Sequence, residues 1–259
     1  MVQEGDDVLL SIRGLVKDFG GLRAVNHCSF DVRAGTITGL IGPNGAGKTT
    51  LFNVLSRLYQ PTTGTVTFDG ADLLDVPAHR IARLGLARTF QNVALFPALT
   101  VLENVMTGGH AEGSIGFGRA MLRIGATREE AAQRRRGIDL LERLDLGHLA
   151  HRPVAGLPFG TLKRIELARA LAADPRLLML DEPANGLTHS EVDDLGETIK
   201  AIRDQFDLTI LLVEHHMAMV MTISDHIVVL DFGRKIAEGP PSAIRNDPLV
   251  IEAYLGAPA

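Results

Sequence analysis

Short apolar runs alternate with segments of helical spacing along most of the chain. Residues 36–41, 177–180, 208–213 and 226–230 are apolar runs of the length and composition typical of buried strands. Between the second and third of these runs, at 188–206, apolar residues recur with the spacing of a helix face. Strands separated by helices usually pair in parallel, so the pattern predicts an α/β fold with a mostly parallel sheet.

The middle of the chain breaks this alternation. Residues 127–144 have the pattern of a charged helix, and residues 157–172 form a second helical region. We therefore expect a helical sub-domain at 92–172. It would be inserted between a first part of the α/β core at 1–91 and a second part at 173–259.

Composition excludes several classes of protein. The 259 residues are 46% hydrophobic and 22% charged, which is ordinary globular usage. With 26 Lys and Arg against 31 Asp and Glu, the chain lacks the basic surplus of a nonspecific nucleic-acid binder, and no nucleic-acid partner is expected. The single cysteine, Cys28, rules out a disulfide framework and a four-thiolate zinc site, and we expect it to be buried as a small hydrophobic residue.

No apolar stretch has the length of a membrane span. A span needs about 20 mostly apolar residues. The longest apolar stretch, 208–223, is interrupted by Glu214, His215 and His216. We expect a cytoplasmic chain that, if it works at a membrane, is held there by another protein.

The motif with the clearest chemistry is GPNGAGKT at residues 42–49, which matches the phosphate-loop pattern G-x-x-x-x-G-K-[ST] at every fixed position. It follows a strand-like run and precedes a predicted helix at 48–58. The glycines let successive backbone N–H groups surround phosphate oxygens, and the helix N-terminus favours anions. Lys48 is predicted to pair with the β- and γ-phosphates of a nucleotide, and the Thr49 hydroxyl to ligate Mg²⁺. The predicted nucleotide contacts of the loop are Gly42, Pro43, Asn44, Gly45, Ala46, Gly47, Lys48, Thr49 and Thr50.

Two acidic residues, Asp181 and Glu182, directly follow the apolar run at 177–180. In open α/β sheets, ligands bind at the carboxyl ends of the strands. Asp181 is therefore predicted to hold Mg²⁺, directly or through water, and Glu182 to act as the general base that polarises the attacking water. Together with the phosphate loop, these residues predict an ATP-hydrolysing site.

With these motifs, the chain resembles the nucleotide-binding subunit of an ATP-binding-cassette (ABC) transporter, from about residue 8 to residue 256. The resemblance implies a P-loop NTPase core with a mostly parallel sheet, an N-terminal antiparallel β part and an inserted helical sub-domain. It also implies ATP and Mg²⁺ as ligands and ATP hydrolysis as the reaction.

Further site residues follow from the resemblance. Phe19 occupies the place of the aromatic residue that stacks on adenine, where Tyr is more usual. Gln91, in ARTFQNVALFP, matches the glutamine that contacts Mg²⁺ and faces the membrane partner. His215, in LLVEHHM, matches the switch histidine that touches the γ-phosphate, and His216 stands where the family usually has Asp.

The signature stretch of the family, commonly LSGGQ, corresponds here to LPFGT at residues 157–161. Leu157 and Gly160 are kept, and the LKRIELARAL that follows fits the signature helix of the family. The resemblance implies that Gly160 lies just before the N-terminus of this helix. There it would approach the γ-phosphate of an ATP bound by a second chain.

The departures from the common motifs resemble one subfamily, the ATP-binding subunits of high-affinity branched-chain amino acid importers. The matching segments are the LAYG-type signature at 157–160, ANGL at 184–187, VEHHM at 213–217 and AYLG at 253–256. Relatives in this group also serve short amides and urea. The resemblance therefore implies the ATP-binding subunit of an importer for branched-chain amino acids or related small polar solutes.

A subunit of this type implies several partners. ATP would lie between this chain and a second cassette, which is either an identical copy or a sister chain. A separate permease would span the membrane, and a solute-binding protein would deliver the solute. The chain would then be peripheral, on the cytoplasmic face of the inner membrane.

Other cassette proteins fit the sequence less well. A soluble cassette ATPase of DNA repair needs a coiled-coil insertion or zinc-hook cysteines, and a translation-factor type needs two tandem cassettes; the sequence has neither feature. The main alternative is the ATPase of an exporter, including the lipopolysaccharide-export type, which is similar in length but usually retains LSGGE. The sequence leaves the transported solute open.

Overall fold

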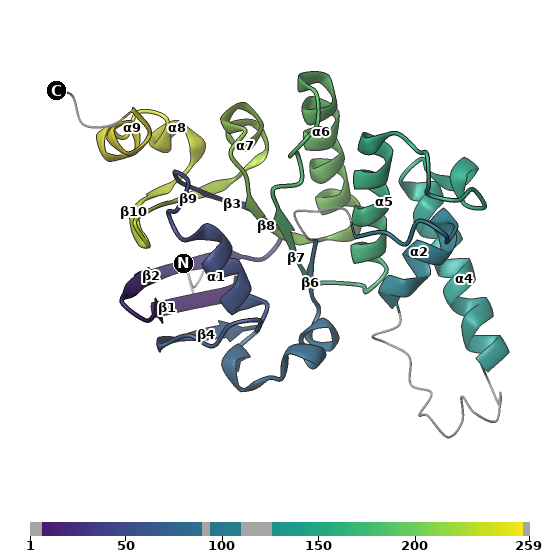
Figure 1. The fold of residues 1–259 in the computed structure, drawn as a ribbon, viewed down its shortest axis with the longest axis horizontal. Coiled ribbons are helices and arrows are strands. Elements are labelled where there is room, and N and C mark those ends of the chain that lie inside the picture. Colours follow the sequence, from purple (N-terminus) through teal and green to yellow (C-terminus); the bar gives the residue numbers. More distant parts are fainter. Residues whose placement is uncertain (1–6, 90–93, 110–125, 256–259) are drawn as a thin grey trace. The chain divides into compact units, whose positions relative to one another are not determined.

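The computed structural model shows two compact units within the chain (Figure 1). The structure describes residues 7–89, 94–109 and 126–255. Unit 1 combines Met1–Ile81 with Arg176–Ala259, and unit 2 comprises Ala82–Pro175. Unit 1 is thus built from two segments that are far apart in the sequence. The functional division expected at 92–172 stays a prediction.

Unit 1 contains an antiparallel sheet and a mostly parallel sheet. The antiparallel sheet has the order β2-β1-β4-β5, with β1 (Val8–Phe19), β2 (Leu22–Arg33), β4 (Thr63–Phe68) and β5 (Ala71–Asp72). Within this unit the second sheet runs β10-β9-β3-β8-β7, with β3 (Ile37–Ile41), β7 (Leu177–Asp181), β8 (Thr209–Val213), β9 (His226–Asp231) and β10 (Arg234–Gly239). β3 pairs in parallel with β8 and β9, β7 pairs in parallel with β8, and β10 is antiparallel to β9. The expected α/β core, with a mostly parallel sheet and an N-terminal antiparallel part, is confirmed.

The central strands of the parallel sheet are buried along their whole length. Every residue of β3, β7 and β8 is buried, which explains why these strands read as continuous apolar runs. Helix α1 (Lys48–Leu55) contacts both β2 and β7 and so lies between the two sheets. Helices α6 (His189–Phe206) and α7 (Met217–Ile223) lie on the other side of the parallel sheet (Figure 1). Because β3, β7 and β8 are parallel, their carboxyl ends meet at one edge of the sheet, where a ligand site is expected.

The remaining elements of unit 1 are short or terminal. They are the 3-10 helices η1 (Leu73–Asp75) and η2 (Ala78–Leu84), of which η2 runs into unit 2, and the helices α8 (Pro241–Ile244) and α9 (Pro248–Leu255).

Unit 2 is mostly helical, as its sequence pattern predicts. Its elements are β6 (Leu86–Arg88), α2 (Val101–Gly108), α4 (Ala126–Arg143), η4 (Gly147–Leu149) and α5 (Phe159–Leu171). Helix α2 packs against both α4 and α5. The contact between α2 and α5 needs a glycine at position 108, since a Cβ on Gly108 would lie 1.9 Å from the Arg169 carbonyl oxygen.

Two local outcomes bear on the sequence predictions. Helix α1 ends at Leu55 rather than at residue 58. The Ser56 hydroxyl donates to the Phe52 carbonyl at 2.6 Å, and Arg57 takes a left-handed φ of 60°, which no helix can continue. Cys28 is fully buried, as expected, and burial raises the pKa of its thiol to about 12.

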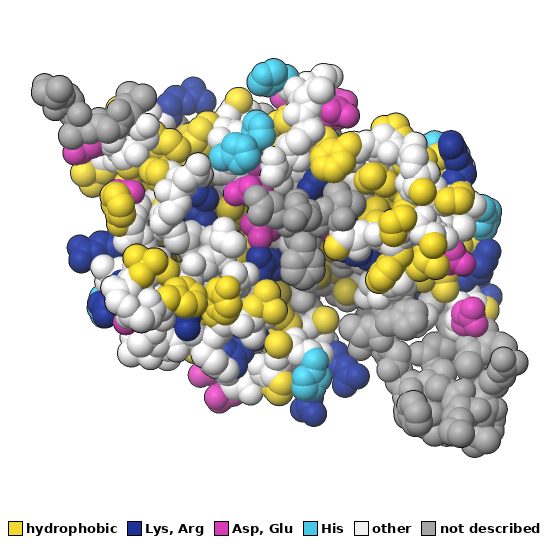
Figure 2. Space-filling view, in the orientation of Figure 1, with side chains coloured by type: hydrophobic (Ala, Val, Ile, Leu, Met, Phe, Trp, Pro, Cys, Tyr) yellow, Lys and Arg dark blue, Asp and Glu magenta, His cyan; other side chains and the backbone are white. Residues whose placement is uncertain are grey.

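The charge distribution on the surface and the character of the helices bear on two expectations from the sequence. On the face drawn in Figure 2, Lys and Arg side chains are interspersed with Asp and Glu side chains. Within the described ranges, no helix combines the length and the apolar character needed to cross a membrane.

Candidate functional site

The predicted phosphate loop joins the buried end of β3 to the start of α1. Three of its glycines have positive φ angles: 150° at Gly42, 81° at Gly45 and 100° at Gly47. A Cβ on Gly42 would lie 2.1 Å from the Leu230 carbonyl oxygen, and a Cβ on Gly47 would lie 2.3 Å from the Ala24 carbonyl oxygen. These two positions therefore require glycine both for their backbone conformation and for the space around them. The loop has the strand–loop–helix context that phosphate binding needs, and its shape fits a phosphate cradle.

The other loop residues differ in exposure. Asn44, Gly45 and Thr49 are exposed, Pro43 and Thr50 are half-buried, and Ala46 is buried. The Thr49 hydroxyl therefore stands in the first turn of α1 on a side chain that solvent can reach.

Two segments from the C-terminal part of the chain contact the phosphate loop. The Gly233 amide, in the turn between β9 and β10, donates to the Ala46 carbonyl at 3.0 Å. Tyr254 of α9 forms a hydrogen bond with the Gly42 backbone. Burial raises the pKa of the Tyr254 phenol, and this hydrogen bond opposes the rise. A cavity of about 540 Å³ borders the loop between this turn and α9.

Lys48 is buried at the first position of α1. Its ammonium group donates to the Gly42 carbonyl at 2.6 Å and to the Pro43 carbonyl at 3.0 Å, so it lies against the loop that precedes it. Burial lowers the pKa of Lys48, and the negative charge of Glu182 opposes this shift. The structure thus brings together the predicted phosphate-binding cation and the predicted general base.

The two acidic residues stand at the carboxyl end of β7. Asp181 is the last residue of β7 and is buried, and it pairs in register with Val213 of β8. Glu182 follows with a left-handed φ of 47°, which is uncommon for a residue other than glycine. The Glu182 amide donates to the Val213 carbonyl at 2.9 Å, which holds the residue in this conformation. The backbone of both residues is therefore held at the carboxyl ends of β7 and β8.

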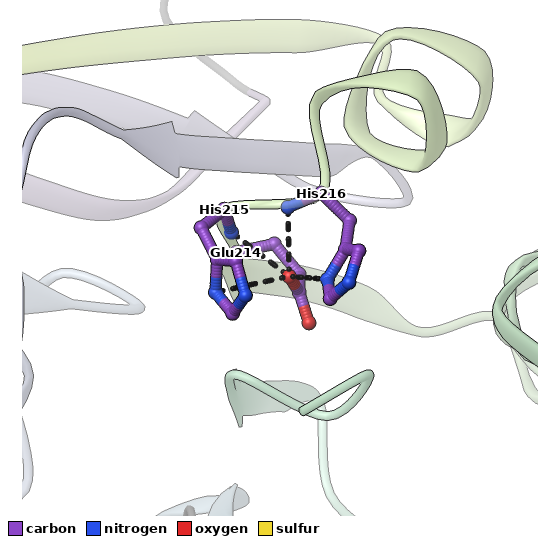
Figure 3. A group of neighbouring side chains, drawn as sticks. All are labelled: Glu214, His215 and His216. Atoms are coloured by element: carbon purple, nitrogen blue, oxygen red, sulfur yellow. Dashed lines mark hydrogen bonds and ion pairs between the residues drawn. The ribbon is translucent and has the colours of Figure 1, made fainter. Parts of the chain in front are cut away.

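The predicted switch histidine follows β8 in a cluster with Glu214 and His216 (Figure 3). Glu214 is fully buried, and its Oε2 accepts from the backbone amides of His215 at 2.8 Å and His216 at 3.1 Å. The Nδ1 atom of His216 lies 3.0 Å from the same oxygen. The other oxygen, Oε1, accepts from the Ala184 amide at 2.8 Å. About half of the His215 side chain, 51%, is exposed, so its ring is accessible to a ligand.

This cluster also has donor atoms of the kinds that bind metals. One ligand atom from each of Glu214, His215 and His216 lies within 4.8 Å of the others. The Oε2 atom of Glu214, however, already accepts two backbone N–H bonds and faces the His216 ring. A metal ion at this oxygen would have to displace those donors, so the geometry favours a hydrogen-bonded anchor over a metal centre.

The predicted adenine-stacking residue, Phe19, ends β1 and is 41% exposed. Its ring packs edge-on against Tyr59, with ring centroids 5.3 Å apart and an interplanar angle of 79°. The Lys17 ammonium lies 4.7 Å from the Phe19 ring centroid. Phe19 is therefore a partly exposed surface residue rather than a core residue.

The signature stretch lies in unit 2 at the start of α5. The helix begins at Phe159, because the Leu162 amide donates to the Pro158 carbonyl at 3.0 Å and so closes the first turn. Gly160 is therefore the second residue of the helix, whereas the sequence placed it just before the helix. Gln91 lies outside the described residues.

Three residues that contact site residues were not predicted from the sequence to belong to the site: Tyr59, Glu214 and Tyr254. Glu214 and Tyr254 lie within the VEHHM and AYLG segments, but these motifs assign them no contact, because each contacts a segment far away in the chain. Of the three, only Glu214 had a visible signal, since a charged residue directly after a buried apolar strand is unusual unless it is paired.

The ABC transporter family profile matches residues 25–185, and the profile of the branched-chain amino acid ATP-binding cassette transporters matches residues 234–259. The chain is 44% identical to the high-affinity branched-chain amino acid transport ATP-binding protein BraF of Pseudomonas aeruginosa, over 96% of this chain and 98% of that protein. It is 31% identical to the lipopolysaccharide export system ATP-binding protein LptB of Haemophilus influenzae, over 96% of this chain and 97% of that protein.

Solved structures agree with this similarity. The fold resembles the crystal structure of a nucleotide-free ATP-binding cassette from an ABC transporter, with a TM-score of 0.84 and 30% sequence identity. The match covers 96% of this chain and 99% of that cassette.

Proposed function

The chain belongs to the ATP-binding subunits of ABC transporters, and from this premise we propose that it energises an importer of branched-chain amino acids or of related small polar solutes such as amides and urea. The observation that carries the proposal is the 44% identity to BraF over nearly the whole of both chains. The match of residues 234–259 to the branched-chain amino acid cassettes supports it from a different part of the sequence.

The nucleotide would be held by the phosphate loop and by Phe19. The loop amides and the Lys48 ammonium donate to the phosphates, while the exposed Phe19 ring stacks on adenine. The Thr49 hydroxyl and the Asp181 carboxylate are oxygen donors of the kind that Mg²⁺ prefers, and the resemblance adds Gln91. When bound, Mg²⁺ neutralises charge on the β- and γ-phosphates.

Glu182 and His215 would carry out the chemistry. Glu182 accepts a proton from the attacking water and orients that water toward the γ-phosphorus. His215, with its accessible ring, donates a hydrogen bond to a γ-phosphate oxygen as negative charge develops there. The proximity of Glu182 to Lys48 supports this assignment, since the base and the phosphate-binding cation must serve the same group.

A second cassette would complete the site. We propose that Gly160 of one chain approaches the γ-phosphate held by the Lys48 loop of the other, whether the second chain is identical or a sister subunit. A separate permease, served by a solute-binding protein, would dock this pair on the cytoplasmic face of the inner membrane. Among the alternatives, the lipopolysaccharide exporter is disfavoured by the lower identity, 31%, to its ATP-binding protein.

Purification of the chain with its permease tests whether the transporter imports or exports, and which solute it carries. The proposal expects a solute-binding protein to associate with the complex, and branched-chain amino acids, amides or urea to bind that protein in a solute screen. A complex without any solute-binding protein, whose ATPase responds to a lipid instead, would favour the exporter.

Substitution of Gly160 tests the two-chain site. Gly160→Asp adds bulk and a negative charge in the first turn of α5, where a partner's triphosphate would dock. We expect hydrolysis to be abolished while the chain still binds ATP through its own phosphate loop. Pro158→Ala is the matched control, because Pro158 contributes a fixed φ and no amide donor. It should change the rate by less than about 10-fold, or about 1.4 kcal/mol.

Both variants can be assayed for nucleotide binding and for phosphate release. If Gly160→Asp hydrolysed ATP at the wild-type rate, residues 157–161 would not be the signature and the partner's contribution would have to come from another segment.

A further inference from the structure

The geometry points to Glu214 as a positioning residue that holds the predicted general base and the predicted switch histidine in one arrangement. The inference rests on the roles proposed above for Glu182 and His215. Glu214 itself contacts neither substrate nor cofactor in this account. It acts through hydrogen bonds that it accepts from backbone amides in the segments that carry Glu182 and His215.

One oxygen of Glu214, Oε1, holds the turn that carries the predicted base, Glu182. We call residues 182–187 the catalytic turn; it is closed by bonds from the Asn185 amide to the Glu182 carbonyl at 3.1 Å and from the Leu187 amide to the Ala184 carbonyl at 3.1 Å. Glu214 Oε1 accepts from the Ala184 amide at 2.8 Å. The Glu182 amide bonds to the carbonyl of Val213, the residue directly before Glu214. The end of β8 therefore holds the backbone on both sides of the Glu182 side chain.

This double attachment matters because Glu182 has a left-handed φ of 47°. A residue other than glycine keeps such a conformation only when its surroundings impose it. If the Ala184 bond is lost, the turn can relax toward an ordinary conformation, and the Glu182 carboxylate then moves relative to Lys48.

The second oxygen fixes the switch segment. Glu214 Oε2 accepts from the amides of both His215 and His216 and faces the His216 ring (Figure 3). The backbone at His215 is thereby held, while its ring stays half-exposed and able to reach a ligand. One buried carboxylate thus links the ends of β7 and β8.

Only a carboxylate satisfies this arrangement. Glu214 is fully buried and receives backbone N–H donors on both of its oxygens, which compensates the cost of burying its charge. A glutamine has one acceptor oxygen and one NH₂ group. In either amide orientation, the NH₂ group would face a backbone N–H, from Ala184 on one side or from His215 on the other.

The test compares Glu214→Gln with Glu191→Gln in the full chain. Glu191 also accepts a backbone bond, from the Thr188 amide at 2.9 Å, but it caps α6 at the surface. We expect Glu214→Gln to lower the kcat of MgATP hydrolysis on the order of 10²-fold, as misplacement of a catalytic group does. Its affinity for ATP should stay within about 3-fold, because Lys48 and the phosphate loop are intact. Glu191→Gln should keep kcat within about 2-fold of the wild-type value.

A double variant separates positioning from a general loss of structure. In the Glu182→Gln background, Glu214→Gln should lower the residual rate by a clearly smaller factor than in the wild-type background, because one of the two groups that it positions is already gone. If the two effects multiply, or if Glu214→Gln reduces ATP affinity as much as kcat, the positioning role is overturned. If Glu182→Gln hydrolysed ATP normally, the role of Glu182 as general base would be wrong. The single variant Glu214→Gln would then test only whether Glu214 positions His215.

Glu214→Asp guards against a glutamine variant that does not fold. Aspartate keeps the charge and both acceptor oxygens, but its side chain is one methylene shorter and cannot reach both segments. We expect kcat to fall by about 10-fold or more with ATP affinity retained. A wild-type kcat in Glu214→Asp would overturn the proposal.

Discussion

Lys48→Ala is expected to remove most of the affinity of the chain for MgATP. The Lys48 ammonium is buried against the carbonyls of Gly42 and Pro43, and burial already lowers its pKa. Its positive charge is therefore held in place, and the cost of desolvating it is met before a nucleotide binds. A charge-assisted hydrogen bond contributes about 1.5–3 kcal/mol, so loss of two phosphate contacts should weaken binding by about 10²-fold or more.

Titration with a fluorescent ATP analogue measures this effect. Lys200→Ala is the matched control, because Lys200 lies on α6 and its ammonium group pairs with the exposed Glu197 side chain at 3.2 Å. The control should bind as the wild-type chain does, since exposed ion pairs contribute little. Near-wild-type affinity in Lys48→Ala would show that this loop does not bind the phosphates.

Glu182→Gln is expected to separate binding from hydrolysis. The substitution keeps the shape of the side chain and the backbone bond to Val213 but removes the proton acceptor. Hydrolysis should fall by about 10²-fold or more, as loss of a general base does. ATP should still bind, because the phosphate loop is unchanged, and an ATP-bound pair of chains should accumulate.

Size-exclusion chromatography with and without MgATP detects that pair, and a phosphate-release assay gives the rate. Normal hydrolysis by Glu182→Gln would move the base to another residue, with His215 as the nearest candidate by chemistry.

The phosphate loop and the strands around it could be predicted from the sequence because local patterns determine them. Gly42 and Gly47 are required by close backbone contacts, and the same glycines define the motif. The strands β3, β7 and β8 are buried throughout, so they appear as continuous apolar runs. Asp181 and Glu182 could be placed because they end such a run.

Other features depend on contacts that no local pattern contains. Strand β2 carries the polar residues Arg23, His27 and Asp31 among its apolar positions, and its pairing with β1 rather than its own sequence makes it a strand. The Glu214 carboxylate meets the Ala184 amide across 30 positions of sequence. The start of α5 was misplaced because the first helical bond uses the carbonyl of Pro158, a residue that can precede a helix or begin it.

Transport in a reconstituted system tests the central claim, that hydrolysis at Glu182 drives uptake through a separate permease. The measurement is the accumulation of labelled leucine in vesicles that contain the permease, the loaded solute-binding protein and either the wild-type chain or Glu182→Gln. We predict that leucine accumulates only with the wild-type chain and only with MgATP, while the variant binds ATP and transports nothing. Accumulation that continues with Glu182→Gln, or without MgATP, would contradict the account.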